Sequence, residues 1–330
     1  MKISVIIPFY QREQGILRRA LMSVLSQQIS DDVEVNIIVV DDGSPVSAQS
    51  EVEGLAFAPP FYLNIITKPN AGVAAARNNG LDAVAAGTDY IAFLDSDDSW
   101  HAGHLRRGIE ALERGCDMYF CDNRRDDVHA SHFASGALFI PYIKKSTISD
   151  GVIAADKDEL LSILIQEFPA QTSTIIYKHA CAPDMQFNTS LKHAGEDKLF
   201  FVQLASMAQR ICFSPDIMVD CGTGVNMYFG HTNWDSPSNL RQVIDDLRSH
   251  YFIRKIVSLS PNNRAFNDAA IVRLRRKVAF LSLRQCIKHQ GRWPRELQLL
   301  AREEEFFYGW FAFCAAQVAM LRAFGLYSPS

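Results

Sequence analysis

Ile3-Ser4-Val5-Ile6-Ile7-Pro8 (residues 3–8) is an apolar run, rich in β-branched residues, that stops at a proline. A run that is apolar at nearly every position is typical of a strand buried in a parallel sheet. Similar runs and helical patterns follow along the chain, and we expect strands at 35–40, 63–67 and 90–94 and helices at 15–28 and 74–86. Strands that alternate with helices predict an α/β fold, with a mostly parallel sheet covered by helices on both faces.

The rest of the chain divides into a less regular part and a helical part. Residues 122–127 are polar and predict a loop, 174–177 predict a strand, and 197–208 predict a helix. From about residue 236 onward the pattern is helical and basic. We therefore expect two domains, one at 1–235 that contains the sheet and a helical one at 236–330.

The composition is that of an ordinary globular protein. The chain has 330 residues, of which 48% are apolar and 21% charged, with 33 Lys and Arg against 37 Asp and Glu. These proportions exclude a disordered chain and a disulfide-stapled miniprotein. The net charge of −4 argues against a nucleic-acid partner, because DNA-binding proteins usually carry a basic excess.

The cysteines indicate free thiols in a reducing compartment. Their number is odd and no Cys-x-x-Cys pair occurs, which disfavours a zinc site and a disulfide framework. Free thiols fit the cytoplasm. The apolar start of the chain meets Pro8 too soon for a secretory signal, so we interpret it as a buried strand. The seven cysteines are Cys116, Cys121, Cys181, Cys212, Cys221, Cys286 and Cys314.

The C-terminal part raises the question of a membrane. Residues 306–321 are apolar except for Gln317, but the stretch is shorter than the roughly 20 residues that a spanning helix needs. It fits a core helix, a helix at an oligomer interface, or a helix that lies on a membrane. Between Arg241 and Arg292 there are 12 Lys and Arg and 3 Asp, a local charge of +9. This charge fits either a solvated helical face or a surface that meets anionic lipid headgroups.

Polar clusters follow three of the predicted strands. They are Pro8-Phe9-Tyr10-Gln11-Arg12-Glu13, Asp41-Asp42 and Asp95-Ser96-Asp97-Asp98. Ligands of doubly wound sheets bind beyond the carboxyl ends of the strands, so these clusters would share one crevice. Converging carboxylates repel each other unless a divalent cation neutralises them, and oxygen ligands favour Mg²⁺ or Mn²⁺. Because such a cation completes its shell with substrate phosphates, the crevice suits a metal–diphosphate ligand.

Two common kinds of nucleotide site are absent from the sequence. The glycine fingerprint of dinucleotide folds is missing after the first strand, where Pro8 and Tyr10 stand instead. No Gly-x-x-x-x-Gly-Lys-Ser/Thr phosphate loop occurs either. A NAD-dependent enzyme and a P-loop ATPase are therefore both disfavoured.

Five motifs follow one another in order across about residues 3–235. They are 5–10 (VIIPFY), 39–44 (VVDDGS), 70–78 (NAGVAAARN), 93–98 (FLDSDD) and 195–197 (GED). Together they resemble the motifs of family 2 glycosyltransferases, which have the GT-A fold. Each is weak alone, but the five in order are specific. The resemblance implies an inverting, metal-dependent hexosyltransferase that uses a nucleotide-sugar donor. Residues 224–228 (GVNMY), followed by Trp234, look like bacterial exopolysaccharide enzymes of the succinoglycan type.

The resemblance also implies which residues bind the donor and the metal. The implied donor-binding residues are Pro8, Tyr10, Glu13, Asp41, Asp42, Arg77, Asp95 and Ser96. The implied ligands of Mn²⁺ or Mg²⁺ are Asp95, Asp97 and His231. Asp98 could instead cap the following helix. The structural alternatives are turn residues for the aspartates, a surface helix residue for Arg77 and a structural role for His231.

The motif at the start of the predicted helix 197–208 carries the candidate base. Direct displacement at the anomeric carbon needs a carboxylate that takes the proton of the acceptor hydroxyl, and the resemblance implies Asp197 for this role, with Glu196 orienting the acceptor or the base. The alternative is a pair of helix-capping residues. Trp100 and Trp234 fit either stacking on an acceptor sugar or core packing.

The leading hypothesis is transfer from a UDP-sugar to a growing saccharide, lipid-linked at the inner face of the plasma membrane. It implies a cytoplasmic protein and leaves room for a peripheral membrane contact or an oligomer. The rival enzyme is a sugar nucleotidyltransferase, which would carry a glycine-rich loop after the first strand, where Pro8 stands. The non-enzymatic rival is a saccharide- or nucleotide-binding module, which would lack Asp97 or Asp197.

Overall fold

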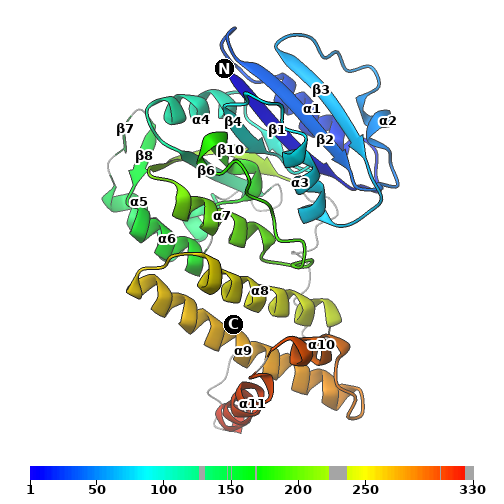
Figure 1. The fold of residues 1–330 in the computed structure, drawn as a ribbon, viewed down its shortest axis with the longest axis vertical. Helices are drawn as coiled ribbons and strands as arrows, with labels where there is room; N and C mark the ends of the chain where they lie inside the picture. The colour runs from blue at the N-terminus through cyan, green and yellow to red at the C-terminus, as the bar shows by residue number, and fades with distance from the viewer. Residues whose placement is uncertain are drawn as a thin grey trace. The chain divides into compact units, whose positions relative to one another are not determined.

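A computed structural model describes residues 1–125, 131–146, 148–149, 151–167, 169–222, 236–304 and 306–323 (Figure 1). The chain forms two compact units. The first comprises the described residues within 1–189 and 200–226, and the second those within 190–199 and 227–330. The functional division expected at residue 235 stays a prediction.

One mixed sheet forms the centre of the first unit. Its strands are β1 (Lys2–Phe9), β2 (Glu34–Asp41), β3 (Phe61–Thr67), β4 (Tyr90–Phe93), β5 (Ser99–Trp100), β6 (Met118–Arg125), β7 (Ile148–Ser149), β8 (Val152–Ala155), β9 (Ile176–Lys178) and β10 (Ile211–Cys221). They lie in the order β3-β2-β1-β4-β9-β6-β10-β8-β7, and β5 pairs with β10. The predicted α/β fold with a mostly parallel sheet is thus confirmed.

The strand directions gather the polar clusters at one edge. Strands β1 to β4 are parallel to one another. The short strand β9 is antiparallel to both β4 and β6, so β6 runs in the same direction as β4, and β10 is parallel to β6. The carboxyl ends of β1, β2, β4, β6 and β10 therefore share one edge of the sheet.

Helices cover both faces of this sheet because the side chains of each strand alternate. The helices of the first unit are α1 (Ile16–Leu25), α2 (Ala48–Val52), α3 (Val73–Asp82), α4 (His104–Glu113), α5 (Phe139–Lys145), α6 (Lys157–Gln166) and most of α7 (Glu196–Met207), with single 3-10 turns at Phe133–Ser135, Thr172–Thr174 and His179–Cys181. Ile3, Val5 and Ile7 of β1 join the core under α1 and α4. Ile6 points to the other face, where a Cβ on Gly80 of α3 would lie 2.4 Å from its Cγ2.

Aromatic rings fill the face of the sheet that β4 turns toward α7. Phe187 and Phe200 stack with their ring centroids 3.9 Å apart, and Phe93 meets them edge-on at 5.4 and 5.7 Å. The guanidinium of Arg77 lies 5.2 Å from the centroid of Phe187. This packing holds α3 and the end of β4 in fixed positions, and both carry candidate site residues.

The second unit is helical, as predicted for the C-terminal region. Its helices are α8 (Pro237–Ile256), α9 (Pro261–Lys288), α10 (Arg295–Glu303) and α11 (Phe307–Ala323). One face of α11 packs into the core of this unit through Phe307, Trp310, Cys314 and Val318. This packing confirms the core-helix alternative for that face. No helix in the described part of the chain is long and apolar enough to cross a bilayer.

One local prediction is wrong, and another is out by two residues at its start. Residues 122–125 are not a loop, because β6 continues through them and pairs there with β10. Burial of Asp122 and Asn123 explains the error, since polar residues there are enclosed by neighbouring chain segments rather than by water. The strand predicted at 174–177 begins later, at Ile176, after a single 3-10 turn.

The expectation of free thiols throughout the chain is also wrong. Cys116 and Cys212, 96 residues apart in sequence, form a disulfide with their Cα atoms 6.1 Å apart. Cys116 precedes β6 and Cys212 lies in β10, two strands that pair with each other. An odd cysteine count without a Cys-x-x-Cys pair could not reveal this, because the pairing depends on which strands become neighbours. The other five cysteines are free.

Candidate active site

The acidic cluster after β4 is the centre of the candidate site. Asp95 and Asp97 are half-buried, whereas Ser96 and Asp98 are buried. Arg77 of α3, itself buried, donates to Asp95 with Nη2 2.8 Å from Oδ1. The Phe187 ring beside Arg77 restricts the guanidinium, so this ion pair fixes the Asp95 carboxylate at the end of its strand. The expected direct contact of Arg77 with the donor stays a prediction.

Asp98 ties the cluster to two distant parts of the chain. Its carboxylate accepts from the side chains of Gln171 and Ser173 and from the backbone N–H of Gly222 at 2.9 Å. Burial, and then the negative charges of Asp95 and Asp97, raise the pKa of Asp98 well above its usual value. The suggestion that Asp98 caps the following helix is wrong, because α4 has Gly103 at its N-cap and no side-chain cap.

The segment 171–174 is a part of the site that sequence analysis missed. Ser173 accepts from the backbone N–H of Asp95 through Oγ at 2.9 Å, and its carbonyl accepts from the indole N–H of Trp100 at 2.7 Å. The available signal was a polar run, Gln-Thr-Ser-Thr, directly before a buried strand. Its role requires β9 to lie beside β4, which local patterns do not predict.

Gly222 closes the site from the end of β10. A Cβ at this position would lie 1.9 Å from the carbonyl oxygen of Asp97 and 2.7 Å from a guanidinium nitrogen of Arg19. Arg19 also donates to that carbonyl at 2.6 Å. Only glycine fits here, so the backbone of β10 can approach the Asp97 loop closely.

Asp41 and Asp42, at the end of β2, are both 3% exposed and hold loops together. Asp41 accepts from the backbone N–H groups of Ser44 and Ala48, each at 2.8 Å. Asp42 accepts from Ala71 and Gly72, at 2.9 and 2.8 Å, and pairs with Lys68. These contacts are those of turn residues, and contact with a nucleobase stays a prediction.

The first motif joins the same network through Gln11. This buried side chain donates to Ser96 at 3.2 Å, and its backbone N–H donates to Ser44 Oγ at 2.8 Å. The Gln11 amide therefore links the first motif to the aspartate loop. Pro8 is buried, Tyr10 is half-buried and Glu13 is exposed at this edge.

The described residues fit a hard divalent cation held mainly by its ligand. Asp95 and Asp97 offer carboxylate oxygens in a loop that also holds the buried carboxylate of Asp98. Among the described residues, no group of three or more His, Cys, Asp or Glu side chains forms a cage for a metal ion. One or two carboxylates plus substrate phosphates is the usual arrangement for Mg²⁺, so the donor set is suitable for it.

Some expected site residues lie elsewhere or outside the described structure. His231 and Trp234 lie outside the described residues. Trp100 is 4% exposed and packs against His104 with ring centroids 4.7 Å apart. The expectation that Trp100 stacks on a sugar is corrected, because neither face of the ring is open.

Glu196 and Asp197 begin α7 and belong to the second unit. Gly195, just before them, has φ +82°, and a Cβ there would lie 2.8 Å from Ser249 Cβ of α8. Lys198 pairs with Asp246 of α8 at 3.4 Å. Both acidic side chains are half-buried. The contacts of Gly195 and Lys198 with α8 therefore fix the start of α7 and the position of the two carboxylates on it.

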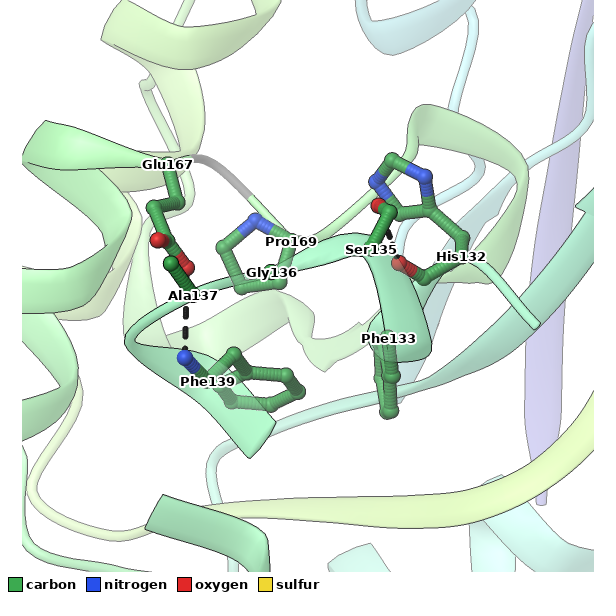
Figure 2. A pocket seen from close by; sticks show the side chains of 8 residues that line it. All are labelled: His132, Phe133, Ser135, Gly136, Ala137, Phe139, Glu167 and Pro169. Atoms are coloured by element: carbon green, nitrogen blue, oxygen red, sulfur yellow. Dashed lines mark hydrogen bonds between the residues drawn. The ribbon is translucent and has the colours of Figure 1, made fainter. Parts of the chain in front are cut away.

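A cavity of about 250 Å³ lies beyond the end of β6 in the first unit (Figure 2). Its wall includes His132, Phe133, Phe139 and Glu167. Glu167 accepts from the backbone N–H groups of Leu138 and Phe139, so its charge satisfies the start of α5. His132 donates through its backbone N–H to Asn123 of β6 at 2.8 Å, which places the cavity at the carboxyl edge of the sheet.

Solved structures define the class of this fold. The chain is similar to S. aureus TarS 1-349 in complex with UDP-GlcNAc, with a TM-score of 0.58 and 16% identity over 99% of this chain and 93% of that one. It is also similar to the mannosyltransferase PcManGT from Pyrobaculum calidifontis, in complex with GDP-Man and Mn2+, with a TM-score of 0.56 and 18% identity over 99% and 81%. The fold of this chain is the GT-A fold of glycosyltransferases.

Sequence comparison gives the family. Residues 4–156 match the family described as Glycosyl transferase family 2. The succinoglycan biosynthesis protein ExoW of Rhizobium meliloti is 33% identical over 261 residues, 76% of this chain and 79% of that protein. The chain belongs to glycosyltransferase family 2, and it is a glycosyltransferase. The minor teichoic acid biosynthesis protein GgaA of Bacillus subtilis is 34% identical over 38% of this chain and 26% of that protein.

Proposed function

We propose that this glycosyltransferase moves a sugar, with inversion, from a UDP-sugar to a saccharide acceptor in the biosynthesis of an exported polysaccharide. The acceptor we propose is lipid-linked. The observation that carries the proposal is the anchored Asp95–Asp97 loop at the shared carboxyl edge of the sheet, held by Arg77, Ser173 and Gln11. The likeness to ExoW supports the polysaccharide context, and the likeness to a UDP-GlcNAc complex supports the donor.

Binding of the nucleotide-sugar donor requires charged groups held in fixed positions at the carboxyl edge of the sheet. Asp95 and Asp97 would hold Mg²⁺ or Mn²⁺, and the bound cation would supply the positive charge that stabilises the leaving diphosphate. Arg77 keeps Asp95 in place, since a buried guanidinium 2.8 Å away leaves it little freedom. The loops ordered by Asp41 and Asp42 would form the walls for the uracil and ribose.

Asp197 is the proposed base for the acceptor. In the proposed step the acceptor hydroxyl oxygen bonds to the anomeric carbon while the bond from that carbon to the diphosphate oxygen breaks. The electron pair of that bond leaves with UDP, and the hydroxyl proton passes to Asp197. Attack opposite to the leaving group inverts the anomeric configuration. Glu196, adjacent at the start of α7, would orient the hydroxyl.

Two variants distinguish the proposed base, Asp197, from the proposed metal ligand, Asp97. Asp197→Asn should lower turnover by about 10²- to 10⁴-fold while the Kd for UDP with Mn²⁺ stays within about twofold, because the base acts on the acceptor. Asp97→Asn should instead abolish the Mn²⁺-dependent part of UDP binding. Asp184→Asn, at an exposed carboxylate of the first unit, is the control and should change neither turnover nor UDP binding.

A screen of nucleotide-sugars provides the direct test. Thermal stabilisation by UDP-sugars with Mn²⁺, but not by GDP-mannose, is the expected result, and NMR of the product should show the opposite anomeric configuration to the donor. Retention of configuration would overturn the proposed direct displacement. Equal loss of UDP binding in both variants would remove Asp197 from the role of base.

A further inference from the structure

Exposed apolar side chains are concentrated in the second unit. Of fifteen large apolar side chains exposed among the described residues, ten lie between Ile256 and Met320. The most exposed are Ile287 at 80%, Tyr308 at 77% and Phe306 at 76%. Single exposed apolar residues are ordinary, but a concentration of them marks a surface that another body covers.

Helix α11 presents a continuous apolar face to solvent. Its residues from Phe307 to Met320 include no charged side chain. Besides the buried face described above, it exposes Tyr308, Ala312, Phe313, Ala316, Ala319 and Met320. At about 100° per residue these positions fill one sector of about 140°. A helix that is apolar all round is normally covered on every side, so this sector, which we call the α11 face, requires an occupant.

Helix α9, which packs against α11, and the turn that follows it carry a concentration of cations. No acidic residue occurs between Asp268 and Glu296, a stretch with eight Lys and Arg. Arg275 and Arg276 turn inward, toward Tyr251 and Gln317. The other six, which we call the basic row, are Arg273, Lys277, Arg284, Lys288, Arg292 and Arg295.

The basic row and the α11 face lie on adjoining parts of the second unit, because α9 packs directly against α11. Arg273, Lys277, Arg284 and Lys288 follow at spacings of four, seven and four residues, which align them along one side of α9. The contact from Arg276 to Gln317, at 3.0 Å, fixes α11 against that helix. The turn after α9 carries exposed Trp293, whose ring centroid lies 5.8 Å from that of Phe311 on α11.

We propose that this surface docks the protein on an anionic lipid bilayer, with the α11 face and Trp293 among the acyl chains and the basic row over the headgroups. Interfacial helices bind membranes by burying apolar side chains among the acyl chains and by the attraction of Lys and Arg to anionic headgroups, and this part of the chain offers both kinds of residue. Tryptophan and tyrosine favour the boundary between the two layers. The inference goes beyond the proposed reaction and does not depend on it.

Charge decides between a bilayer and a second copy of the chain. A two-fold dimer would place the same patch on both partners, so the basic row would face another basic row. No acidic residue within 269–295 is available to offset that repulsion. Anionic headgroups supply the opposite charge, which favours the bilayer.

Sedimentation of the full chain with vesicles tests the proposal without donor or acceptor. Vesicles of phosphatidylcholine with about one third phosphatidylglycerol should bind the chain roughly tenfold more tightly than phosphatidylcholine alone. Tyr308→Ser with Phe313→Ser should weaken binding to the anionic vesicles by roughly tenfold. Arg284→Gln with Lys288→Gln and Arg292→Gln should reduce it toward the neutral level. Met22→Ser with Tyr62→Ser, exposed in the first unit, is the matched control.

Two results would overturn the inference. One is the absence of binding to anionic vesicles by the unaltered chain. The other is a dimer in sedimentation velocity that the Tyr308→Ser, Phe313→Ser variant dissociates without any change in vesicle binding, which would assign the face to a second copy. Unfolding midpoints of both variants within about 2 °C of the unaltered chain would exclude a folding defect, and the charge variant tests the proposal even if the apolar one fails to fold.

Discussion

At Gly222 the backbone of β10 approaches the Asp97 loop so closely that no side chain fits. Gly222→Ala would place a Cβ 1.9 Å from the Asp97 carbonyl oxygen, so the acidic loop must shift. We expect the Kd for UDP in the presence of Mn²⁺ to rise by about tenfold or more, since small displacements of site groups are costly. Isothermal titration calorimetry measures this directly.

The matched control for that variant is Gly309→Ala. No atom of the residues that the structure describes lies within 4 Å of a Cβ added at Gly309, which belongs to α11 of the second unit. It should leave UDP binding unchanged. An unaltered Kd in Gly222→Ala would show that the aspartate loop does not hold the donor.

His104 makes stability depend on pH. Burial, and then the nearby His101, lower the pKa of this fully buried residue to about 3, from 6.5. In the unfolded chain His104 is therefore protonated below about pH 6.5, whereas in the folded chain it stays neutral down to about pH 3. The contribution of neutral His104 to the free energy of unfolding is fully present above pH 6.5. It is lost as the pH falls, so the free energy of unfolding decreases by about 2 kcal/mol between pH 7.5 and 5.

Urea unfolding at those two pH values tests the role of His104. His104→Asn should be less stable at pH 7.5 but should lose about 2 kcal/mol less on acidification. His289→Asn, at an exposed position, is the control and should keep the original pH dependence. Equal slopes in His104→Asn and the unaltered chain would contradict the assignment.

At the scale of elements, the start of α1 depends on a carboxylate from α2. Helix α1 has Gly15 at its N-cap and no side-chain cap of its own. Buried Glu51 accepts instead from the N–H groups of Gly15, at 2.8 and 2.9 Å, and Arg18, at 3.2 Å. Glu51→Gln should lower the free energy of unfolding by about 1–2 kcal/mol, because one buried donor loses a charged acceptor.

The neighbouring Glu53 provides the control for this element. Its side chain is exposed, and only its backbone carbonyl contacts Arg18. Glu53→Gln should therefore leave the urea midpoint unchanged. If both variants unfolded at the same urea concentration, the capping role of Glu51 would be wrong.

Strands and helices were predicted correctly where the local pattern of apolar residues matches the residues that are buried in the fold. The strands β1, β2 and β3 and the helix α1 were predicted within a few residues, because each is an apolar run or an amphipathic face that ends in a proline or a turn cluster. The prediction failed at 122–125, where Asp122 continues β6 and is buried. Its carboxylate accepts from the N–H of Phe133 at 3.0 Å, a contact that compensates its burial.

At the scale of the whole chain, the Cys116–Cys212 disulfide joins segments 96 residues apart. A thiol assay on the unfolded, unreduced protein should find 5 free thiols, and the reduced protein should give all 7. Reduction should lower the free energy of unfolding by up to roughly 4 kcal/mol, because the unfolded chain regains the freedom of a long loop. Cys212→Ser should show the same loss without reductant. Seven titratable thiols in the unreduced protein would contradict the pairing.

The candidate site was predictable in outline but not in its connections. The sequence shows that apolar strands end at Asp41, Asp42, Asp95 and Asp97. The ends of parallel strands share one edge of the sheet, so these four aspartates could be predicted to gather there. The partners that fix these aspartates were not predictable, since Ser173 is 75 residues from Asp98 and Gly222 is 124 residues from it. Trp100, equally compatible with packing or sugar binding in the sequence, proved to be a core residue.

The sequence by itself determined the alternation of strands and helices, the acidic strand ends and the membership in glycosyltransferase family 2. These features depend on the order of residues along the chain, because each apolar run or helical face carries its own pattern of burial. Only the tertiary structure decided that β9 separates β4 from β6, that Gly222 lies against Asp97, and that Cys116 meets Cys212. Contacts of this kind depend on which strands become neighbours, and the free energy that selects those neighbours is shared over the whole core.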